Sequence, residues 1–350
     1  MKALVYGNGN YFNCKKEAVK DEITGFINSY LPGEYMGLPV YLPDQISEIQ
    51  YDVIYVMAAE NAFCEMVYTL LDHGVPGEKI LIGQNLKPYI GGEELFIGEE
   101  KRFFIDENCK LIYKFGSMCI SFSTYDEFYG IRDVFCNRDY DFSMPGSQFV
   151  VCDIGMNIGA AALYFASRDD VAKVYGYEPF EQTYKTAVYN IQKNETLRDK
   201  IETKNVGMGN CRREQQIMYN ASMVCGLSTD AEISKIAKEQ YKTWGLYKGE
   251  TECLNTVSII DISEELENII WNNKEKNKLL LKIDCEGAEY EILQRLKERD
   301  LLKDVSMIMM EWHYKGESFV RDILEESGFC LFSFAKGTSM GNIYAVNYND

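Results

Sequence analysis

The chain of 350 residues contains few basic residues, few prolines and almost no histidine. It has 36 Lys and Arg against 54 Asp and Glu, a formal net charge of −18, 7 Pro and 2 His. An acidic chain repels phosphate backbones, so we expect no nucleic-acid substrate. The small number of prolines and the absence of biased tracts exclude a collagen-like or largely disordered chain. The hydrophobic content of 46% is typical of a globular protein with a sizeable core.

The sequence also lacks the run of about 18 apolar residues that a membrane helix needs. Its first residues, MKALVYGNGN, hold an apolar run that is too short for a signal peptide. The 11 Cys form no CxxC pair, so we expect reduced thiols, and clustered zinc or iron–sulfur ligands are not indicated. These features predict a cytoplasmic protein without membrane insertion, and the length predicts about two domains.

Residues 1–100 alternate between strand and helix patterns and predict a small doubly wound unit. Its expected strands are Lys2–Tyr6, Ile23–Asn28, Asp52–Ala58 and Lys79–Gly83, and its expected helices are 11–20 and 62–73. The Gly91-Gly92 pair and the charged run 99–102 mark the expected exit from this unit. Residues 101–147 are expected to connect it, through short strands and one helix, to a second unit.

Residues 148–350 repeat the alternation on a larger scale. The expected strands are 148–154, Lys173–Pro179, Ile201–Val206, Val257–Asp261, Leu279–Asp284 and Met307–Trp312, and the expected helices begin at Ile158, Glu286 and Ser318. The predicted fold class is therefore α/β, with a large Rossmann-like sheet preceded by a smaller doubly wound Rossmann-like domain.

A glycine loop follows the first strand of this second unit and is the first candidate ligand site. The strand ends on Asp153, and Gly155, Asn157 and Gly159 allow a tight turn and a close approach of the backbone to a ligand. A nicotinamide fingerprint would place glycine at positions 157 and 160, which are Asn and Ala. A carboxylate at the strand end suits a ligand with a cationic amino acid moiety, such as S-adenosylmethionine. Glu178 ends the next strand, where an acidic group can bind ribose hydroxyls; the alternative is a tight turn that binds nothing.

Acidic residues also end two later strands. Asp284 and Glu286 follow one buried strand, and Glu311 and His313 lie two residues apart at the end of the next. If these strands are parallel, all four side chains reach the same edge of the sheet. Close carboxylates can bind a divalent cation, with Asp284 and Glu286 or Glu311 as ligands, or one group can act as a general base. The expected base is His313 or Asp284, with Glu311 as a further catalytic candidate.

Four segments together resemble the FkbM family of S-adenosylmethionine-dependent methyltransferases, in the family's order and spacing: VVCDIGMNIGAAAL, VYGYEPFEQTYKTAVYNIQKN, LLLKIDCEGAEYEIL and MIMMEWH. The resemblance covers roughly residues 148–350. It implies a class I methyltransferase fold and methyl transfer to oxygen, usually a hydroxyl of a sugar, glycan or natural product.

The same resemblance assigns the candidate site residues to two ends of one crevice. It implies that the cofactor is lined by Asp153, Gly155, Asn157, Gly159 and Glu178. It places the acceptor end at Asp284, Glu286, Glu311 and His313. The sequence departs from the family pattern at Cys285, where a β-branched residue is common, and at 210–255, which is expected to be a variable insertion near the acceptor pocket.

The amino-terminal unit more loosely resembles small Rossmann-like domains of bacterial sugar- and polysaccharide-modifying enzymes. Those domains carry GxGxxG and an acidic residue after the second strand, but here Phe12 and Asn28 occupy the third glycine and acidic positions. We therefore expect a degenerate nucleotide-binding fold that serves in substrate docking or in forming a homodimer. Two rival functions stay open: an NAD(P)-dependent sugar-modifying enzyme that uses Gly7-Asn8-Gly9, and a non-catalytic two-domain binding protein.

Overall fold

The computed structural model describes residues 1–58, 60–82, 103–273 and 277–347. The chain divides into two compact units, Met1–Tyr129 and Gly130–Asp350. This division lies within the segment that was expected to connect the two domains. The predicted exit from the first domain, Gly91-Gly92 and residues 99–102, lies outside the described residues.

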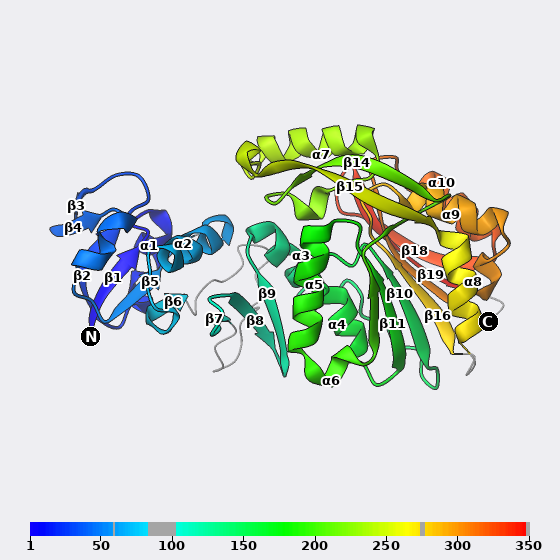
Figure 1. Ribbon diagram of the computed structural model, residues 1–350, viewed down its shortest axis with the longest axis horizontal. Coiled ribbons are helices and arrows are strands. Elements are labelled where there is room, and N and C mark those ends of the chain that lie inside the picture. The colour runs from blue at the N-terminus through cyan, green and yellow to red at the C-terminus, as the bar shows by residue number, and fades with distance from the viewer. Residues whose placement is uncertain (59, 83–102, 274–276, 348–350) are drawn as a thin grey trace. The chain divides into compact units, whose positions relative to one another are not determined.

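The amino-terminal unit contains a six-stranded sheet with the order β3-β4-β2-β1-β5-β6 (Figure 1). Its strands are β1 (Lys2–Tyr6), β2 (Glu22–Ile27), β3 (Gly33–Tyr35), β4 (Leu38–Tyr41), β5 (Val53–Val56) and β6 (Ile80–Ile82). All neighbouring pairs are parallel except β3 with β4. Helix α1 (Asn10–Lys15) follows β1 and α2 (Glu60–Asp72) follows β5. The predicted doubly wound arrangement is therefore present.

A second, antiparallel sheet belongs to the same unit and packs against α2. It consists of β7 (Phe103–Ile105), β8 (Leu111–Phe115) and β9 (Met118–Phe122), and α3 (Tyr125–Phe135) follows it. Tyr68 of α2 joins this sheet to the helix, because its hydroxyl donates to the Phe122 carbonyl and accepts from the Leu111 amide.

The carboxyl-terminal unit contains a seven-stranded sheet with the order β12-β11-β10-β16-β17-β19-β18. Its strands are β10 (Phe149–Ile154), β11 (Val171–Tyr177), β12 (Ile201–Lys204), β16 (Lys278–Ile283), β17 (Met307–His313), β18 (Phe329–Ala335) and β19 (Met340–Asn347). Six of these strands run in one direction, and β19, between β17 and β18, runs in the opposite direction. The chain proceeds outward from β10 in one direction and later returns to place β16 on its other side. The junction of β10 and β16 is thus the switch point at which open α/β sheets bind ligands, and the predicted α/β class is confirmed.

Two sets of helices belong to this sheet. Helices α4 (Ala160–Ala166), α5 (Glu181–Lys193) and α6 (Glu195–Arg198) connect β10, β11 and β12. Helices α8 (Ile262–Asn272), α9 (Glu289–Glu298) and α10 (Ser318–Glu326) share one apolar core with β10, β16, β17 and β19. Figure 1 shows the two sets beside different parts of the sheet.

The expected insertion is a folded layer with a core of its own. Strands β13 (Gly207–Gly209), β14 (Arg213–Asn220) and β15 (Glu252–Asp261) form a separate sheet in the order β13-β15-β14. Helix α7 (Ala231–Thr243) packs Ala237 and Tyr241 on β14 and β15. The predicted strand Val257–Asp261 is therefore the end of the longer strand β15 in this three-stranded sheet.

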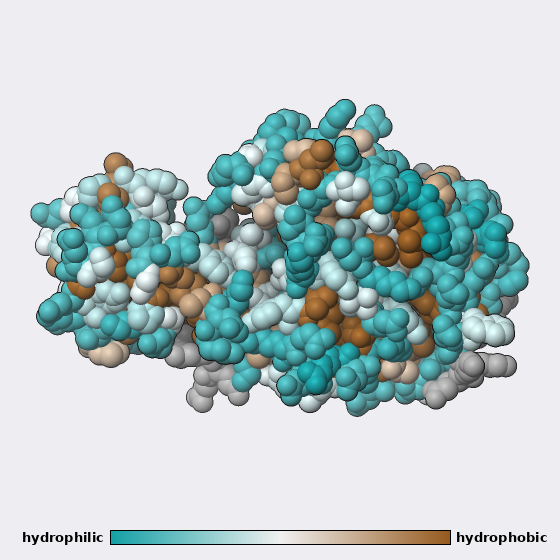
Figure 2. All heavy atoms as spheres, viewed as in Figure 1, coloured by the Kyte–Doolittle hydropathy of each residue, from teal (hydrophilic) through white to brown (hydrophobic). Residues whose placement is uncertain are grey.

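The surface is largely polar. Figure 2 shows hydrophilic residues over most of one face, with hydrophobic residues in separate small groups. Among the helices of the described residues, none is long and apolar enough to cross a membrane.

Candidate functional site

Gly155 brings the loop after β10 into contact with the loop after β16. Its φ of 78° lies in the left-handed region, and a Cβ there would overlap the Asp284 carbonyl oxygen. The Gly155 and Met156 amides both donate to the Tyr177 carbonyl of β11, and the Asp284 amide donates to the Ile154 carbonyl. Only glycine can satisfy both the backbone angle and the lack of space. The ends of β10, β11 and β16 are therefore tied together at the switch point.

Glu178 anchors the rest of the glycine loop. Its Oε2 accepts the Asn157 amide at 3.0 Å and its Oε1 accepts the Phe180 amide at 3.0 Å. Asn157 has a φ of 51°, and Gly159, with a φ of 86°, precedes α4. Burial raises the pKa of Glu178 to about 7, although the two amides act in the opposite direction. Four predicted cofactor residues thus lie together at one turn.

Asp153, the fifth predicted cofactor residue, lies beneath this turn. Its carboxylate is 0% exposed, and the Lys282 ammonium, itself buried on β16, lies 3.1 Å from its Oδ1. Lys282 also donates to the Gly155 carbonyl at 2.5 Å. Burial raises the pKa of Asp153, and Lys282 opposes this effect. In this arrangement the Asp153 carboxylate holds Lys282, and Lys282 holds the loop.

Lys282 was not singled out from the sequence, although the signal was present. A lysine within the apolar strand LLLKI needs a buried partner, and β-sheet pairing places it directly opposite Asp153. Burial alone would lower the pKa of Lys282, but Asp153 and Asp284 raise it above its usual value. The lysine is therefore a buried cation between two carboxylates.

The structure brings Asp284, Glu286 and His313 together beyond the ends of β16 and β17. The His313 ring is 2% exposed, and its Nε2 lies 3.4 Å from Glu286 Oε1 and 4.0 Å from Asp284 Oδ1. Its Nδ1 lies 2.5 Å from Oε1 of Glu289, which is 0% exposed. Because β16 and β17 are parallel, the expected convergence of these strand ends is present.

The charged groups of this cluster lie close enough to shift one another's pKa values. Burial alone would lower the pKa of His313, but Glu286 and Glu289 raise it well above its usual value. Burial raises the pKa of Glu286 well above its usual value, and His313 opposes this effect. Burial would also raise the pKa of Asp284, but Lys282 and His313 outweigh it and lower that pKa. Asp284 is therefore more readily ionised than Glu286.

Glu311 lies at the same sheet edge but interacts mainly with other charged residues. Its Oε2 is 3.4 Å from the Lys336 ammonium, which also lies 2.7 Å from Asp139 Oδ2. Burial raises the pKa of Glu311, and it raises the pKa of nearby Asp133 to about 7. Glu311 thus belongs to the edge of the cluster rather than to the group around His313.

Residues from outside the recognised motifs contact the group around Asp284 and Glu286. The Tyr140 hydroxyl donates to Asp284 Oδ2 at 2.9 Å. From the insertion, Ser228 donates to the Glu286 carbonyl, and the Ile233 side chain occupies the space that a Cβ on Gly287 would need. No motif in the sequence indicated these residues, because they come from segments far along the chain.

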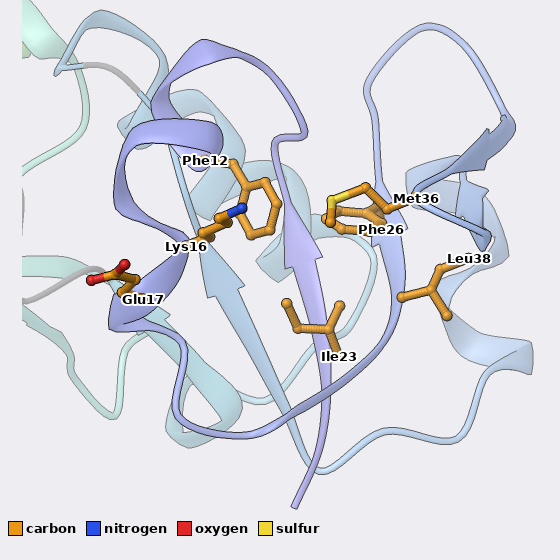
Figure 3. A pocket seen from close by; sticks show the side chains of 7 residues that line it. All are labelled: Phe12, Lys16, Glu17, Ile23, Phe26, Met36 and Leu38. Carbon is orange, nitrogen blue, oxygen red and sulfur yellow. The ribbon is translucent and has the colours of Figure 1, made fainter.

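The amino-terminal loop is organised differently. Phe12 is 1% exposed and packs edge-on against Phe26, with ring centroids 5.2 Å apart. It lines a mainly apolar pocket with Phe26, Met36 and neighbouring residues (Figure 3). The Asn28 amide donates to Asn8 Oδ1, and its oxygen accepts two backbone amides. Phe12 therefore occupies the first turn of α1, where close approach of a dinucleotide would require a small residue.

Comparison with known proteins identifies the family of the carboxyl-terminal unit. Residues 153–331, slightly more than half of the chain, match the family described as the methyltransferase FkbM domain. The methyltransferase sdnD of Sordaria araneosa is 26% identical over 212 residues, which cover 57% of this chain and 80% of that protein. The AMB antimetabolite synthetase AmbE of Pseudomonas aeruginosa is 26% identical over 247 residues, which cover 62% of this chain and only 11% of that protein.

Among solved structures, the methyltransferase FkbM from Methylobacillus flagellatus matches with a TM-score of 0.39 and 11% identity. The match covers 98% of this chain and 89% of that chain. The extent of the family match, together with the α/β sheet and the glycine loop at its switch point, identifies this chain as a methyltransferase of the FkbM family.

Proposed function

We propose that this chain is an S-adenosylmethionine-dependent O-methyltransferase that acts on a hydroxyl of a sugar, glycan or other natural product. Membership of the FkbM family supports methyl transfer. The carboxylate of Glu178, which holds the glycine loop, supports a donor with ribose hydroxyls. The acidic, polar acceptor end supports an acceptor that forms hydrogen bonds.

The contact between Gly155 and Asp284 carries this proposal. It joins the donor loop directly to the strand end that begins the acceptor site. A donor bound over Gly155 and Glu178 would therefore place its methyl group beside Asp284 and the groups around it. In this proposal the methyl donor and the acceptor therefore bind side by side.

The reaction is an in-line displacement. The acceptor oxygen forms a bond to the methyl carbon, the bond from that carbon to sulfur breaks, and S-adenosylhomocysteine leaves. The hydroxyl proton passes to a base on the protein. Alignment of donor and acceptor can lower such a barrier by about 7–11 kcal/mol, and a positioned base contributes about 10²–10⁴-fold.

Among the three predicted catalytic residues, the contacts favour Glu311 as the base. Asp284 accepts from Tyr140 through one oxygen and faces His313 with the other. His313 is held through Nδ1 by Glu289. Among the described residues, the ion-pair partner of Glu311 is Lys336, whose ammonium lies beside Oε2. The other carboxylate oxygen of Glu311 is therefore available to a substrate hydroxyl.

Calorimetric titration of the full chain with S-adenosylhomocysteine tests the cofactor half of the proposal, with NAD as the parallel ligand. We expect micromolar affinity for S-adenosylhomocysteine and none for NAD. Glu178→Gln should weaken the affinity by about 10-fold or more, because it removes a charged acceptor for the ribose hydroxyls. Glu181→Gln is the matched control, because Glu181 lies nearby on α5 but is exposed and paired with Lys185.

Each outcome separates this proposal from its rivals. Binding of NAD alone would move the chemistry to the amino-terminal unit, and binding of neither ligand would favour a non-catalytic binding protein. Binding of S-adenosylhomocysteine that is unchanged in Glu178→Gln would contradict the assigned cofactor site. A positive result justifies an acceptor screen among carbohydrates. For the amino-terminal unit we propose substrate docking or homodimer formation, and we propose a cytoplasmic location for the whole.

A further inference from the structure

We propose that Asp284, Glu286 and His313 bind one divalent metal ion. Each residue offers one ligand atom, and the three atoms all lie within 4.8 Å of one another. Ion–ligand bonds of about 2.0–2.2 Å place the ligand atoms of one ion roughly 3–4.4 Å apart. His313 Nε2 lies 3.4 Å from Glu286 Oε1 and 4.0 Å from Asp284 Oδ1. Both separations lie in this range, and the third pair of atoms lies within 4.8 Å, so a small movement of the carboxylates brings all three atoms to one ion.

The orientation of His313 supports the site independently of the carboxylates. The His313 side chain is only 2% exposed. Its Nδ1 is bound to the buried Glu289, and Glu289 is itself held by the Gly287 amide. Nε2 forms none of the hydrogen bonds found among the described residues and is directed at Glu286 and Asp284. Metal-binding histidines share this arrangement, in which one ring nitrogen donates to a carboxylate and the other offers its lone pair to the ion.

The two carboxylate ligands are also held in place. Asp284 Oδ2 accepts from the Tyr140 hydroxyl at 2.9 Å, so Oδ1 remains directed toward His313. Glu286 has a φ of 52°, an unusual backbone conformation for a non-glycine residue, and Ser228 of the insertion holds its carbonyl. The loop and the insertion together fix the direction in which Glu286 projects.

The charge around the three ligands is suited to a cation. Glu289 and Glu311 add two further carboxylates at this end of the sheet. The neighbouring ammonium groups are closest to other partners: Lys282 lies 3.1 Å from Asp153, and Lys336 lies 2.7 Å from Asp139. A divalent ion would reduce the remaining repulsion. Two hard oxygens with one imidazole nitrogen favour Mn²⁺ or a similar ion over Ca²⁺, which prefers oxygen alone.

This site differs from the sequence-based expectation and deepens the proposed function, on which it rests. The sequence paired Asp284 with Glu286 or Glu311, whereas the structure adds His313 and leaves Glu311 beside Lys336. Three protein ligands leave coordination positions open. An acceptor hydroxyl can occupy one of them, next to Glu311, so the ion would position the oxygen that receives the methyl group.

Titration of the chelator-treated full chain with MnCl₂, followed by the electron paramagnetic resonance signal of free Mn²⁺, tests the site. We expect one Mn²⁺ per chain. Asp284→Asn and His313→Gln should each weaken binding by about 100-fold or more. Glu289→Gln should weaken it by about 10–100-fold, because Glu289 orients a ligand without touching the ion. The matched control is His73→Gln, which removes the other, exposed histidine and should leave binding unchanged.

The same samples are titrated with S-adenosylhomocysteine, so that the two proposals can fail separately. S-adenosylhomocysteine binding without Mn²⁺ binding at millimolar concentration overturns the metal site and leaves the proposed function standing. Mn²⁺ binding without S-adenosylhomocysteine binding leaves the metal site standing and overturns the proposed function. Mn²⁺ binding that persists in Asp284→Asn and His313→Gln also overturns the site. If a buried variant fails to fold, Glu286→Gln, at a partly exposed ligand, gives the decisive measurement.

Discussion

The two units place similar loops on similar parallel strands, yet their interiors differ at equivalent positions. Strand β1 pairs with β5 as β10 pairs with β16, and a glycine with a left-handed backbone angle, Gly7 or Gly155, directly follows each first strand. Directly opposite one another lie Val5 and Tyr55 in the first unit, and Asp153 and Lys282 in the second. An apolar residue faces a tyrosine in one case, and a buried ion pair supports the loop in the other.

The ends of the second strands show the same contrast. Asn28 contacts Asn8 of its loop through a neutral amide, whereas Glu178 contacts Asn157 through a carboxylate. Five residues after the first loop glycine, Phe12 is buried in one unit and Ala160 begins a helix in the other. The shared fold supplies the turn, but only the second unit has the charge and the small residues that a nucleoside ligand requires.

The largest effect is expected from Lys282→Met, which gives the second loop an apolar partner like that of the first. Asp153 would lose its buried partner, and breaking a buried ion pair costs about 3–5 kcal/mol of unfolding free energy. Tryptophan fluorescence during urea unfolding measures this selectively, because Trp244, Trp271 and Trp312 all lie in the carboxyl-terminal unit. The double variant with Asp153→Asn should recover much of the loss. Equal stability of Lys282→Met and the original chain would refute the role of this pair.

Gly155→Ala tests the close backbone contact in the second loop, and Gly9→Ala, at an open position of the first loop, is its control. Gly155→Ala should cost about 2–4 kcal/mol, from a left-handed backbone angle and an overlap with the Asp284 carbonyl. Gly9 has a φ of −86° and no atom within 4 Å of an added Cβ, so its change should stay within about 0.5 kcal/mol. Urea unfolding followed by far-ultraviolet circular dichroism reports on both units. Similar losses for the two variants would contradict the difference in packing.

The affinity for S-adenosylhomocysteine should depend on pH through Glu178, which has no titrating counterpart at Asn28. Its pKa of about 7 reflects burial, which Lys282 opposes and Asp153 reinforces. Ribose hydroxyls donate to the ionised form, so affinity is full above this pKa and is lost as the pH falls through it. Calorimetry should show about 10-fold weaker binding at pH 6 than at pH 8, equivalent to about 1.4 kcal/mol. In Glu178→Gln the affinity should be low and independent of pH over this range; a similar pH dependence in that variant would assign the effect to another group.

The smallest effect is expected from Asn28→Asp, which gives the first unit the acidic residue of the second. The new carboxylate would face Asn8 Oδ1 in place of a donor and would cost about 1 kcal/mol. NAD should still fail to bind, because Phe12 remains packed against Phe26. Circular dichroism and calorimetry check the two statements. NAD binding by this single variant would show that Phe12 is no obstacle.

Local patterns in the sequence predicted much of the fold and the candidate residues of the site. Apolar runs ending in Asp153, Glu178 and Asp284 indicated parallel strands with polar residues at their carboxyl ends, and these strands are present. The pattern failed where partners come from elsewhere. It did not indicate α7 and β14 within the insertion, because their apolar residues pack on each other in a small separate core.

The sequence by itself determined which residue types end the strands, because strand length and the glycine turns are local properties. Only the tertiary structure decided what those residues contact. It buried Asp153 against Lys282, directed His313 toward Asp284 and Glu286, and left Glu311 beside Lys336. The physical reason is that a charged side chain acquires its role from its partner and its burial. Both depend on which strands become neighbours, and here the switch point makes neighbours of β10 and β16, which are far apart in the chain.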